Sequence, residues 1–233
     1  MASRPVTTPA AAIPADRLAG ALPPEPLETA AAWLAQAWSL RAQPNPNSMT
    51  LATSSRDGRP SARVVLCKEI VARPGYVVFY TNYHSRKGRE LADNPRAAAV
   101  LHFDALQCQV RVEGLIELSP PAESDAYFAS RALQSRIGAW ASDQSEPIDS
   151  REHLREAVAD AASRFGVDPD AAPDAIIPRP PHWGGYRLWA EAVELWESGA
   201  ARIHDRARWS RSLARLGDGR MEVGGWSVTR LQP

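Results

Sequence analysis

The segment 106–118, LQCQVRVEGLIEL, limits the possible folds of this chain more than any other stretch. Its apolar residues Leu106, Cys108, Val110, Val112, Ile116 and Leu118 alternate with Gln107, Gln109, Arg111, Glu113 and Glu117. A period of two residues is that of a β-strand, whose successive side chains point to opposite faces of a sheet. The alternation therefore predicts a half-buried strand with one polar face, as is typical of antiparallel sheets.

Several other short segments carry strand or helix signals. The strand signals are at 49–55, 61–71, 75–82, 96–103, 186–196, 201–209 and 226–233, with an Asp-Gly turn at 57–58. The apolar spacing and the capping residues predict helices over 27–43, 85–94, 121–133 and 150–165. Strands dominate, and no regular alternation of strand and helix occurs. The pattern predicts a mainly β fold with helices, an antiparallel barrel rather than a Rossmann domain.

Composition narrows the class of protein. Lys plus Arg and Asp plus Glu are 27 each, so the net charge is zero and gives no support for binding nucleic acid or a membrane surface through bulk charge. No apolar run approaches the roughly 18 residues of a membrane span, and prolines interrupt the N-terminus where a signal peptide would lie. We therefore expect a cytoplasmic protein, with Cys67 and Cys108 as buried free thiols. Residues 1–26, rich in Ala and Pro, predict a mobile arm before a single domain over 27–233.

The helix expected at 85–94 begins in an unusual way. Ser85 is a good N-cap, but Arg86 and Lys87 lie in the first turn, where the helix dipole disfavours cations. Gly88 adds a propensity cost of about 1 kcal/mol relative to Ala. A bound anion would reverse the first penalty, because free helix N–H groups and two cations would converge on it. The alternative is two exposed basic side chains.

A second set of candidate anion-binding residues lies within and just after the segment ESDAYFASRAL, residues 123–133. Tyr127 and Arg131 are four residues apart on the expected helix and therefore project together, and Ser135 comes just after. A phenol, a guanidinium and a hydroxyl are suited to a phosphate, although a surface Tyr–Arg stack fits the same spacing.

Other polar residues are ambiguous from the sequence alone. Arg63 and Lys68 would face opposite ways in a regular strand, so a clamp that uses both needs a bulge or a strand end. Gln109 on its polar strand face, and Gln144 and Ser145 in a loop, fit either a ligand or solvent.

The segment ARIHDRARW, residues 201–209, brings three basic groups together if it is extended. Arg202, His204 and Arg206 are two residues apart and would then share one face. The five histidines show no metal-binding pattern, and His204 is the one placed for chemistry. No GxSxG turn supports a Ser-His-Asp hydrolase.

Taken together, these segments resemble the pyridoxamine 5′-phosphate oxidase family. The matching stretches are RVVLCK, VFYTNYHSRKGRELADNPRAA, QVRVEG, YFASRALQSRIGAWASDQS, PRPPHWGGYRL, VELW, RIHDR and the final RLQP. They run in the order of the family from about residue 45 to the C-terminus. The resemblance implies an FMN-binding split β-barrel, antiparallel and Greek-key-like, that forms a homodimer with active sites at the subunit interface.

The resemblance also implies which residues bind. FMN is expected to contact Arg63, Val64, Lys68, Tyr80, Thr81, Arg86, Lys87, Gln109, Gln144, Ser145, Trp196 and Arg206. The phosphorylated pyridine substrate is expected to contact Lys68, Tyr127, Arg131, Ser135, Arg202 and His204, of which Arg202 and His204 cover the reacting end. Two departures from the family pattern are Ala132 and Leu133, where a Pro and a basic residue are common.

The implied reaction belongs to vitamin B6 metabolism. Pyridoxamine or pyridoxine 5′-phosphate is oxidised to pyridoxal 5′-phosphate, with O2 as electron acceptor and H2O2 as product. The alternatives are a related split-barrel flavin oxidase acting on another heterocycle, such as a phenazine precursor, and a non-catalytic binder of FMN or pyridoxal phosphate.

Overall fold

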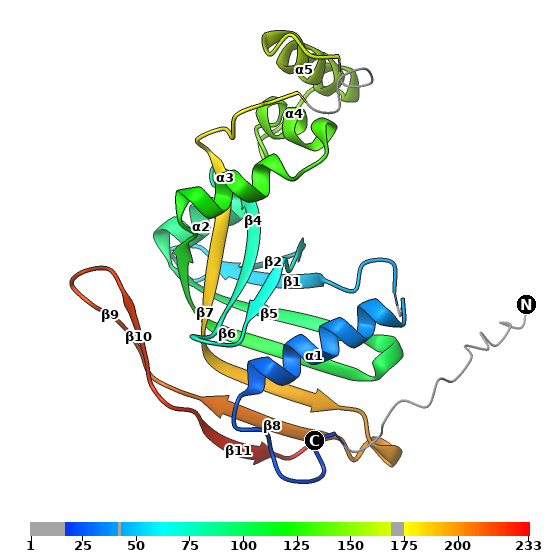
Figure 1. The fold of residues 1–233 in the computed structure, drawn as a ribbon, viewed down its shortest axis with the longest axis vertical. Helices are drawn as coiled ribbons and strands as arrows, with labels where there is room; N and C mark the ends of the chain where they lie inside the picture. The colour runs from blue at the N-terminus through cyan, green and yellow to red at the C-terminus, as the bar shows by residue number, and fades with distance from the viewer. Residues whose placement is uncertain (1–16, 42, 169–174) are drawn as a thin grey trace, which may run out of the picture.

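The computed structural model describes residues 17–41, 43–168 and 175–233. A nine-stranded, antiparallel sheet curls into a half-barrel, with helices at its side and one end (Figure 1). Its strands are β1 (Ser48–Ser54), β2 (Pro60–Leu66), β3 (Glu69–Val71), β4 (Tyr76–Asn82), β5 (Arg96–Phe103), β6 (Cys108–Leu118), β7 (Trp183–Glu197), β8 (Asp205–Ser210) and β11 (Ser227–Leu231). The predicted class, mainly β with helices, is confirmed.

The remaining elements are a hairpin and helices. β9 (Leu213–Arg215) and β10 (Met221–Val223) form a separate two-stranded hairpin. The α-helices are α1 (Pro26–Ser39), α2 (Arg86–Asp93), α3 (Pro121–Ala129), α4 (Leu133–Ala141) and α5 (Arg151–Arg164). Two 3₁₀ turns, η1 (Asp104–Leu106) and η2 (Ala200–Arg202), precede β6 and β8.

The long strand β7 determines the shape of the sheet. Its first half pairs with β4 and its second half with β8, while β6 runs along its other edge (Figure 1). The change of neighbour coincides with a β-bulge, where the register with β6 shifts between Glu113 and Gly114. Gly114 is required there, since a Cβ atom would lie 1.9 Å from the carbonyl oxygen of Trp189. The bulge bends the sheet and separates the two ends of β7.

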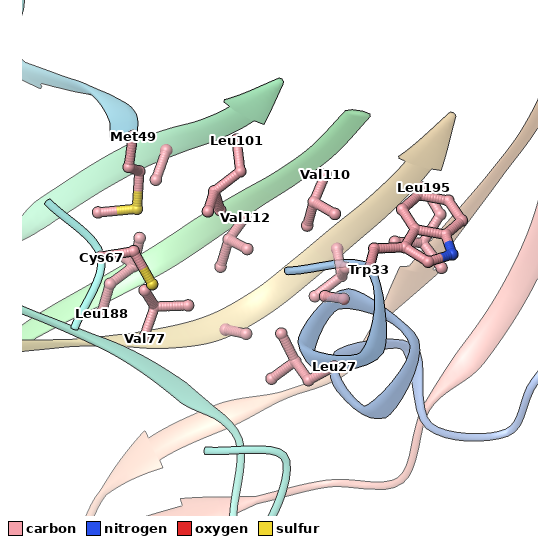
Figure 2. Packing of buried hydrophobic residues seen from close by; sticks show 14 of the residues in the cluster. Leu27, Trp33, Met49, Cys67, Val77, Leu101, Val110, Val112, Leu188 and Leu195 are labelled. Carbon is pink, nitrogen blue, oxygen red and sulfur yellow. The ribbon is translucent and has the colours of Figure 1, made fainter. Parts of the chain in front are cut away.

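Burial along β6 alternates as its sequence predicts. Cys108, Val110, Val112 and Ile116 are buried in the main core, where side chains of α1, β1, β5 and β7 meet them (Figure 2). Leu118 differs and is exposed, because it lies at the strand end. A second, smaller core joins α3, α4 and α5 to Trp183.

Three predicted elements are corrected. The helix expected over 121–133 ends at Ala129, and a further helix, α4, follows after Ala132, whose backbone is non-helical (φ −53°, ψ 143°). The strand expected over 61–71 is divided into β2 and β3 by Cys67 and Lys68. The segment 201–209 is not one extended strand, because η2 occupies its start and β8 begins only at Asp205.

The N-terminal segment also differs in part from the expected mobile arm. Residues 1–16 lie outside the described residues. Leu18, however, is fully buried, and its backbone N–H donates to Glu197 Oε2 at 3.2 Å. Residues 17–25 therefore pack against the sheet before α1 begins.

Both cysteines are buried free thiols, as predicted. Burial raises the pKa of Cys67 to about 12 and that of Cys108 to about 11. Within the described ranges, the helices are too short or too polar for any of them to traverse a lipid bilayer.

Candidate functional site

A cavity of about 650 Å³ lies between the sheet and the helical end of the molecule. Its volume is in the range of small-molecule and cofactor sites. Side chains of β2, β4, α2, α3 and α4 line it, together with the loop after α4. One wall is aromatic: the Tyr80 ring stacks on Tyr127 with 4.0 Å between centroids and on Trp183 with 5.5 Å.

Lys87 supplies a buried cation to this cavity. Its Nζ donates to three uncharged oxygens, Gln144 Oε1 at 2.8 Å, Ser85 Oγ at 2.9 Å and Thr81 Oγ1 at 3.1 Å. Burial and the positive charge of Arg63 lower the pKa of Lys87 from 10.5 to about 8. An ammonium held in this way is suited to a bound anion, which would restore its charge.

The start of α2 adds to the same anion site. The N-cap Ser85 accepts a hydrogen bond from the backbone N–H of Gly88 at 3.3 Å. Gly88 is required by packing, since a Cβ atom would lie 2.0 Å from the carbonyl oxygen of Tyr83. A glycine at this position therefore lets α2 pack closely against Tyr83, in the segment that joins β4 to α2.

Arg131 provides a second cationic group. It lies after the end of α3, with its guanidinium 4.5 Å from the centre of the Trp183 ring. Burial lowers its pKa, and Nη1 is buried without a hydrogen-bond partner. Buried donors of this kind are rare in folded proteins, so this atom indicates the place of a ligand acceptor.

Arg63 and Arg86 differ from the expected arrangement, since neither lines the cavity. Both bind the buried carboxylate of Glu90, with Arg86 Nε at 2.9 Å and Arg63 Nη2 at 3.3 Å. Lys68, in contrast, lies between β2 and β3 and does line the cavity. β2 ends between Arg63 and Lys68, but the two side chains do not form one clamp, because only Lys68 lines the cavity.

A second cluster lies at the far end of β7. Gln109 of β6, Trp196 of β7 and Arg206 of β8 are neighbours across three adjacent strands. Arg206 donates to Glu194 Oε1 at 2.9 Å from Nη2 and at 3.2 Å from Nε. The ring of His204 lies 4.7 Å from that of Trp196.

A tight loop before β8 places His204 beside this cluster and carries the exposed Arg202. Ala201 and Arg202 have positive φ angles of 52° and 65°, so the predicted shared strand face of Arg202, His204 and Arg206 is wrong. The backbone N–H of Gly199 donates to His204 Nδ1 at 3.2 Å. A Cβ atom on Gly199 would lie 1.7 Å from the carbonyl oxygen of Ile203, which explains the glycine.

The two clusters are far apart within one chain. Tyr80 pairs with Gly185 near the start of β7, and Gln109 pairs with Trp196 near its end. Eleven residues at about 3.3 Å each separate these positions by roughly 36 Å along the strand. Figure 1 shows β7 running from the helical end to β8 and β11.

The candidate residues therefore divide into groups. Those that line the cavity are Val64, Lys68, Tyr80, Thr81, Lys87, Tyr127, Arg131, Ser135 and Gln144. Arg63 and Arg86 bind Glu90, and Ser145, beside Gln144, has a positive φ of 79° and is not a lining residue. Gln109, Trp196, Arg202, His204 and Arg206 belong to the far cluster or its loop.

Sequence reasoning missed Trp183 as a cavity residue. It joins the aromatic wall and lies against Arg131. The available signal was an aromatic residue directly before two glycines, a place where the backbone comes close to neighbouring side chains. A Cβ atom on Gly184 would lie 1.9 Å from the hydroxyl of Tyr83.

Comparison with known families gives two matches. Residues 39–165 match the model described as "Pyridoxamine 5'-phosphate oxidase". Residues 183–233 match that described as "Pyridoxine 5'-phosphate oxidase C-terminal dimerisation region". The second match covers β7 to β11 and therefore includes the far cluster from Trp196 to Arg206.

Similar curated proteins carry the corresponding name. Pyridoxine/pyridoxamine 5′-phosphate oxidase of Burkholderia vietnamiensis is 47% identical over 210 residues, and that of Burkholderia mallei is 49% identical over 211 residues. Each alignment covers 90% of this chain and 90% of the relative.

Two solved structures share the fold. PhzG from Burkholderia lata, in complex with tetrahydrophenazine-1-carboxylic acid, has a TM-score of 0.76 and 33% identity, covering 91% of this chain and 94% of its own. A pyridoxamine 5′-phosphate oxidase-related, FMN binding protein from Nostoc punctiforme has a TM-score of 0.64 over 92% of this chain and 100% of its own. Its 17% identity supports the fold alone. On the sequence matches and the shared split barrel, this chain belongs to the pyridoxamine 5′-phosphate oxidase family.

Proposed function

We propose that this protein is an FMN-dependent oxidase that converts pyridoxamine or pyridoxine 5′-phosphate to pyridoxal 5′-phosphate, with O2 as acceptor and H2O2 as product. The observation that carries the proposal is the buried, unpartnered Nη1 of Arg131 in a cavity that also holds the buried Lys87. One cation suits the phosphate of FMN, and the other suits the phosphate of the substrate.

The cofactor end of the cavity is built around α2. Lys87, Thr81 and Gln144, with the first turn of the helix, are the groups suited to the FMN phosphate. A bound FMN would supply the hydride acceptor for oxidation of the substrate carbon that bears the amine or alcohol, and O2 would take up the two electrons and become H2O2. The chain's own task is to hold both rings in register and exclude water.

The substrate end is built from the junction of α3 and α4. Arg131, Tyr127, Ser135 and Lys68 line it, and Lys68 Nζ lies 5.4 Å from the centre of the Tyr127 ring. A guanidinium, an ammonium and two hydroxyls can satisfy the three terminal oxygens of a phosphate ester. The α3–α4 break aids this arrangement, because it releases the side chain of Arg131 from the helix face and lets it lie on Trp183.

His204 acts by donating a hydrogen bond. Because its Nδ1 accepts from the Gly199 N–H, the neutral ring carries its proton on Nε2. Nε2 is then a donor toward the reacting end of the substrate, together with the cationic Arg202. Orientation, rather than proton abstraction, is the role that this contact supports.

The position of the two groups along β7 favours an active site shared by two subunits. The two groups lie at opposite ends of β7, up to roughly 36 Å apart, so we propose that the cavity of one subunit is completed by Gln109, Trp196, Arg202, His204 and Arg206 of the other. The match of residues 183–233 to a dimerisation region supports this arrangement.

The similarity to PhzG favours one second candidate, an oxidase of a phenazine precursor. Its bound molecule is a carboxylic acid, whereas the cavity here combines Arg131, Lys68 and two hydroxyls in a set suited to a phosphate.

The test is anaerobic mixing of the FMN-loaded protein with pyridoxine or pyridoxamine 5′-phosphate. We expect the visible absorbance of the flavin to bleach, and admission of air to restore it with formation of H2O2. Bleaching by tetrahydrophenazine-1-carboxylic acid alone would favour the second candidate. If neither compound bleaches the flavin, the proposed oxidation of a B6 phosphate is wrong, and a binder or an oxidase of another heterocycle remains.

A further inference from the structure

Glu90 is a buried carboxylate at the point where α2 meets the hairpin of β1 and β2. Its side chain is 7% exposed. Four donors on three elements converge on it: Thr53 Oγ1 at 2.5 Å, Ser61 Oγ at 2.7 Å, Arg86 Nε at 2.9 Å and Arg63 Nη2 at 3.3 Å. Burial opposes ionisation, but these hydrogen bonds and the charge of Arg63 lower the pKa of Glu90 to about 2.

Glu90 does not line the cavity, but it lies on the same helix as a residue that does. It is three residues after Lys87, which lines the cavity, and four after Arg86 on the same helix. Arg86 uses Nε for Glu90, so its two terminal nitrogens are not engaged by this contact. Arg63 is further fixed by Leu51 O at 3.2 Å and by Thr53 Oγ1 at 2.5 Å.

We infer that Glu90 is a positioning residue, which orders Arg63, Arg86 and the first turn of α2 before the phosphate of the cofactor arrives. The inference rests on the proposed FMN site. Arginine side chains lose considerable conformational entropy when they are fixed in one position. If Glu90 fixes them when the protein folds, this entropy is not lost again when the cofactor binds.

A negative charge near a phosphate site has an opposing effect, which must be weighed. The carboxylate of Glu90 repels an anion, but four donors already compensate its charge, and it does not line the cavity. Arg63 and Arg86 do not line the cavity either, so Glu90 acts on the phosphate site through the first turn of α2, which carries Lys87. We expect the ordering of this turn to outweigh the repulsion, so that loss of the carboxylate weakens binding of the phosphate.

The variant Glu90→Gln tests this balance, because it keeps the shape of the side chain and removes its charge. We measure dissociation constants of apoprotein for FMN and for riboflavin, which lacks the phosphate, by quenching of flavin fluorescence. We expect the FMN constant to rise about tenfold, on the order of one charge-assisted contact, and the riboflavin constant to change less than about twofold. Glu152→Gln is the matched control, since Glu152 forms an exposed ion pair with Arg155 at 2.9 Å on α5, and it should change neither constant.

Two other outcomes of the binding measurements would overturn the inference. An equal loss for FMN and riboflavin would mean that Glu90 only stabilises the fold. Unchanged or tighter FMN binding would mean that repulsion outweighs ordering. Absence of FMN binding in the wild-type protein would instead overturn the proposed function.

Unfolding by circular dichroism shows whether Glu90→Gln folds. If it does not, Ser61→Ala takes its place, because it removes one donor to Glu90 and one acceptor of Arg63 Nη2 and leaves both ion pairs. It should weaken FMN, but not riboflavin, by about two- to fivefold, since a neutral hydrogen bond contributes less than an ionic one. Equal effects on the two ligands, or no effect on FMN, would overturn the inference here too.

Discussion

Replacing Arg131 by Met separates the folding role of this side chain from its binding role. In the ligand-free protein its Nη1 is buried without a partner, which costs about 1–3 kcal/mol. The guanidinium recovers part of this by lying 4.5 Å from the centre of the Trp183 ring, since a cation–π contact contributes about 0.5–2 kcal/mol. Met keeps an apolar contact with Trp183 and removes the orphaned donor. We therefore expect ligand-free Arg131→Met to be more stable by about 1 kcal/mol, or about 2–4 °C in unfolding temperature.

The same change weakens binding of the phosphorylated ligand. A hydrogen bond to a charged group contributes about 1.5–3 kcal/mol, so affinity for pyridoxal 5′-phosphate should fall by about 10- to 150-fold. Calorimetric unfolding of the apoprotein and titration with pyridoxal 5′-phosphate measure the two effects. Arg164→Met is the control, because its guanidinium lies 4.9 Å from the Trp140 ring but does not line the cavity. A lower unfolding temperature of Arg131→Met with unchanged affinity would refute the reasoning.

Two further predictions concern α2. Lys87 has a pKa of about 8 in the ligand-free protein and loses its charge as pH rises through that value. The affinity for FMN, measured by binding titration, should therefore fall above pH 8. The variant Lys87→Met should remove this pH dependence. The lowered pKa means that the unfolded chain binds more protons between about pH 8 and 10.4, so the contribution of Lys87 to ligand-free stability must rise with pH there, opposite to the change in affinity. Gly88→Ala should destabilise the protein by about 1–2 kcal/mol in chemical unfolding despite better helix propensity, because its Cβ would lie 2.0 Å from Tyr83 O. Gly138→Ala in α4, where nothing lies within 4 Å of the added atom, should stabilise it instead, by up to about 1 kcal/mol; an equal effect of the two substitutions would contradict the packing argument.

Local patterns predicted the parts of the fold that local forces determine. The alternation of segment 106–118 is the alternation of burial along β6, since one face of that strand meets the core. The N-cap Ser85 and the end of α2 before Pro95 also follow from short-range chemistry.

The incorrect predictions concern segments whose backbone conformation depends on tertiary contacts. Nothing in FASRALQSRIGAW marks a helix break, because it contains no proline and its one glycine lies beyond the break, yet the chain leaves the helix so that Arg131 reaches Trp183. The positive φ angles of Ala201 and Arg202 are equally invisible, since neither residue type favours them. The prediction that Arg202 shares a strand face with His204 and Arg206 was wrong for this reason.

The candidate site was predicted in pieces but not in its arrangement. Lys87 was recognisable because a cation in the first turn of a helix is unfavourable without an anion, and Arg131 was recognisable from its spacing to Tyr127 and Ser135. Their separation from Arg202 and His204 depends on the pairing of β7 with β4 at one end and with β8 at the other. Such long-range pairing has no signature in residue spacing.

The most direct measurement for the central claim is the activity of a heterodimer. One subunit carries Arg131→Met in the cavity and the other carries Arg202→Leu in the far cluster, and two affinity tags isolate the mixed species. If each active site uses the cavity of one subunit and the far cluster of the other, one site of the heterodimer carries both changes and its second site carries neither. Formation of pyridoxal 5′-phosphate should then proceed at about half the rate of the wild-type dimer, although each parent homodimer is nearly inactive. A heterodimer as inactive as its parents would contradict the account.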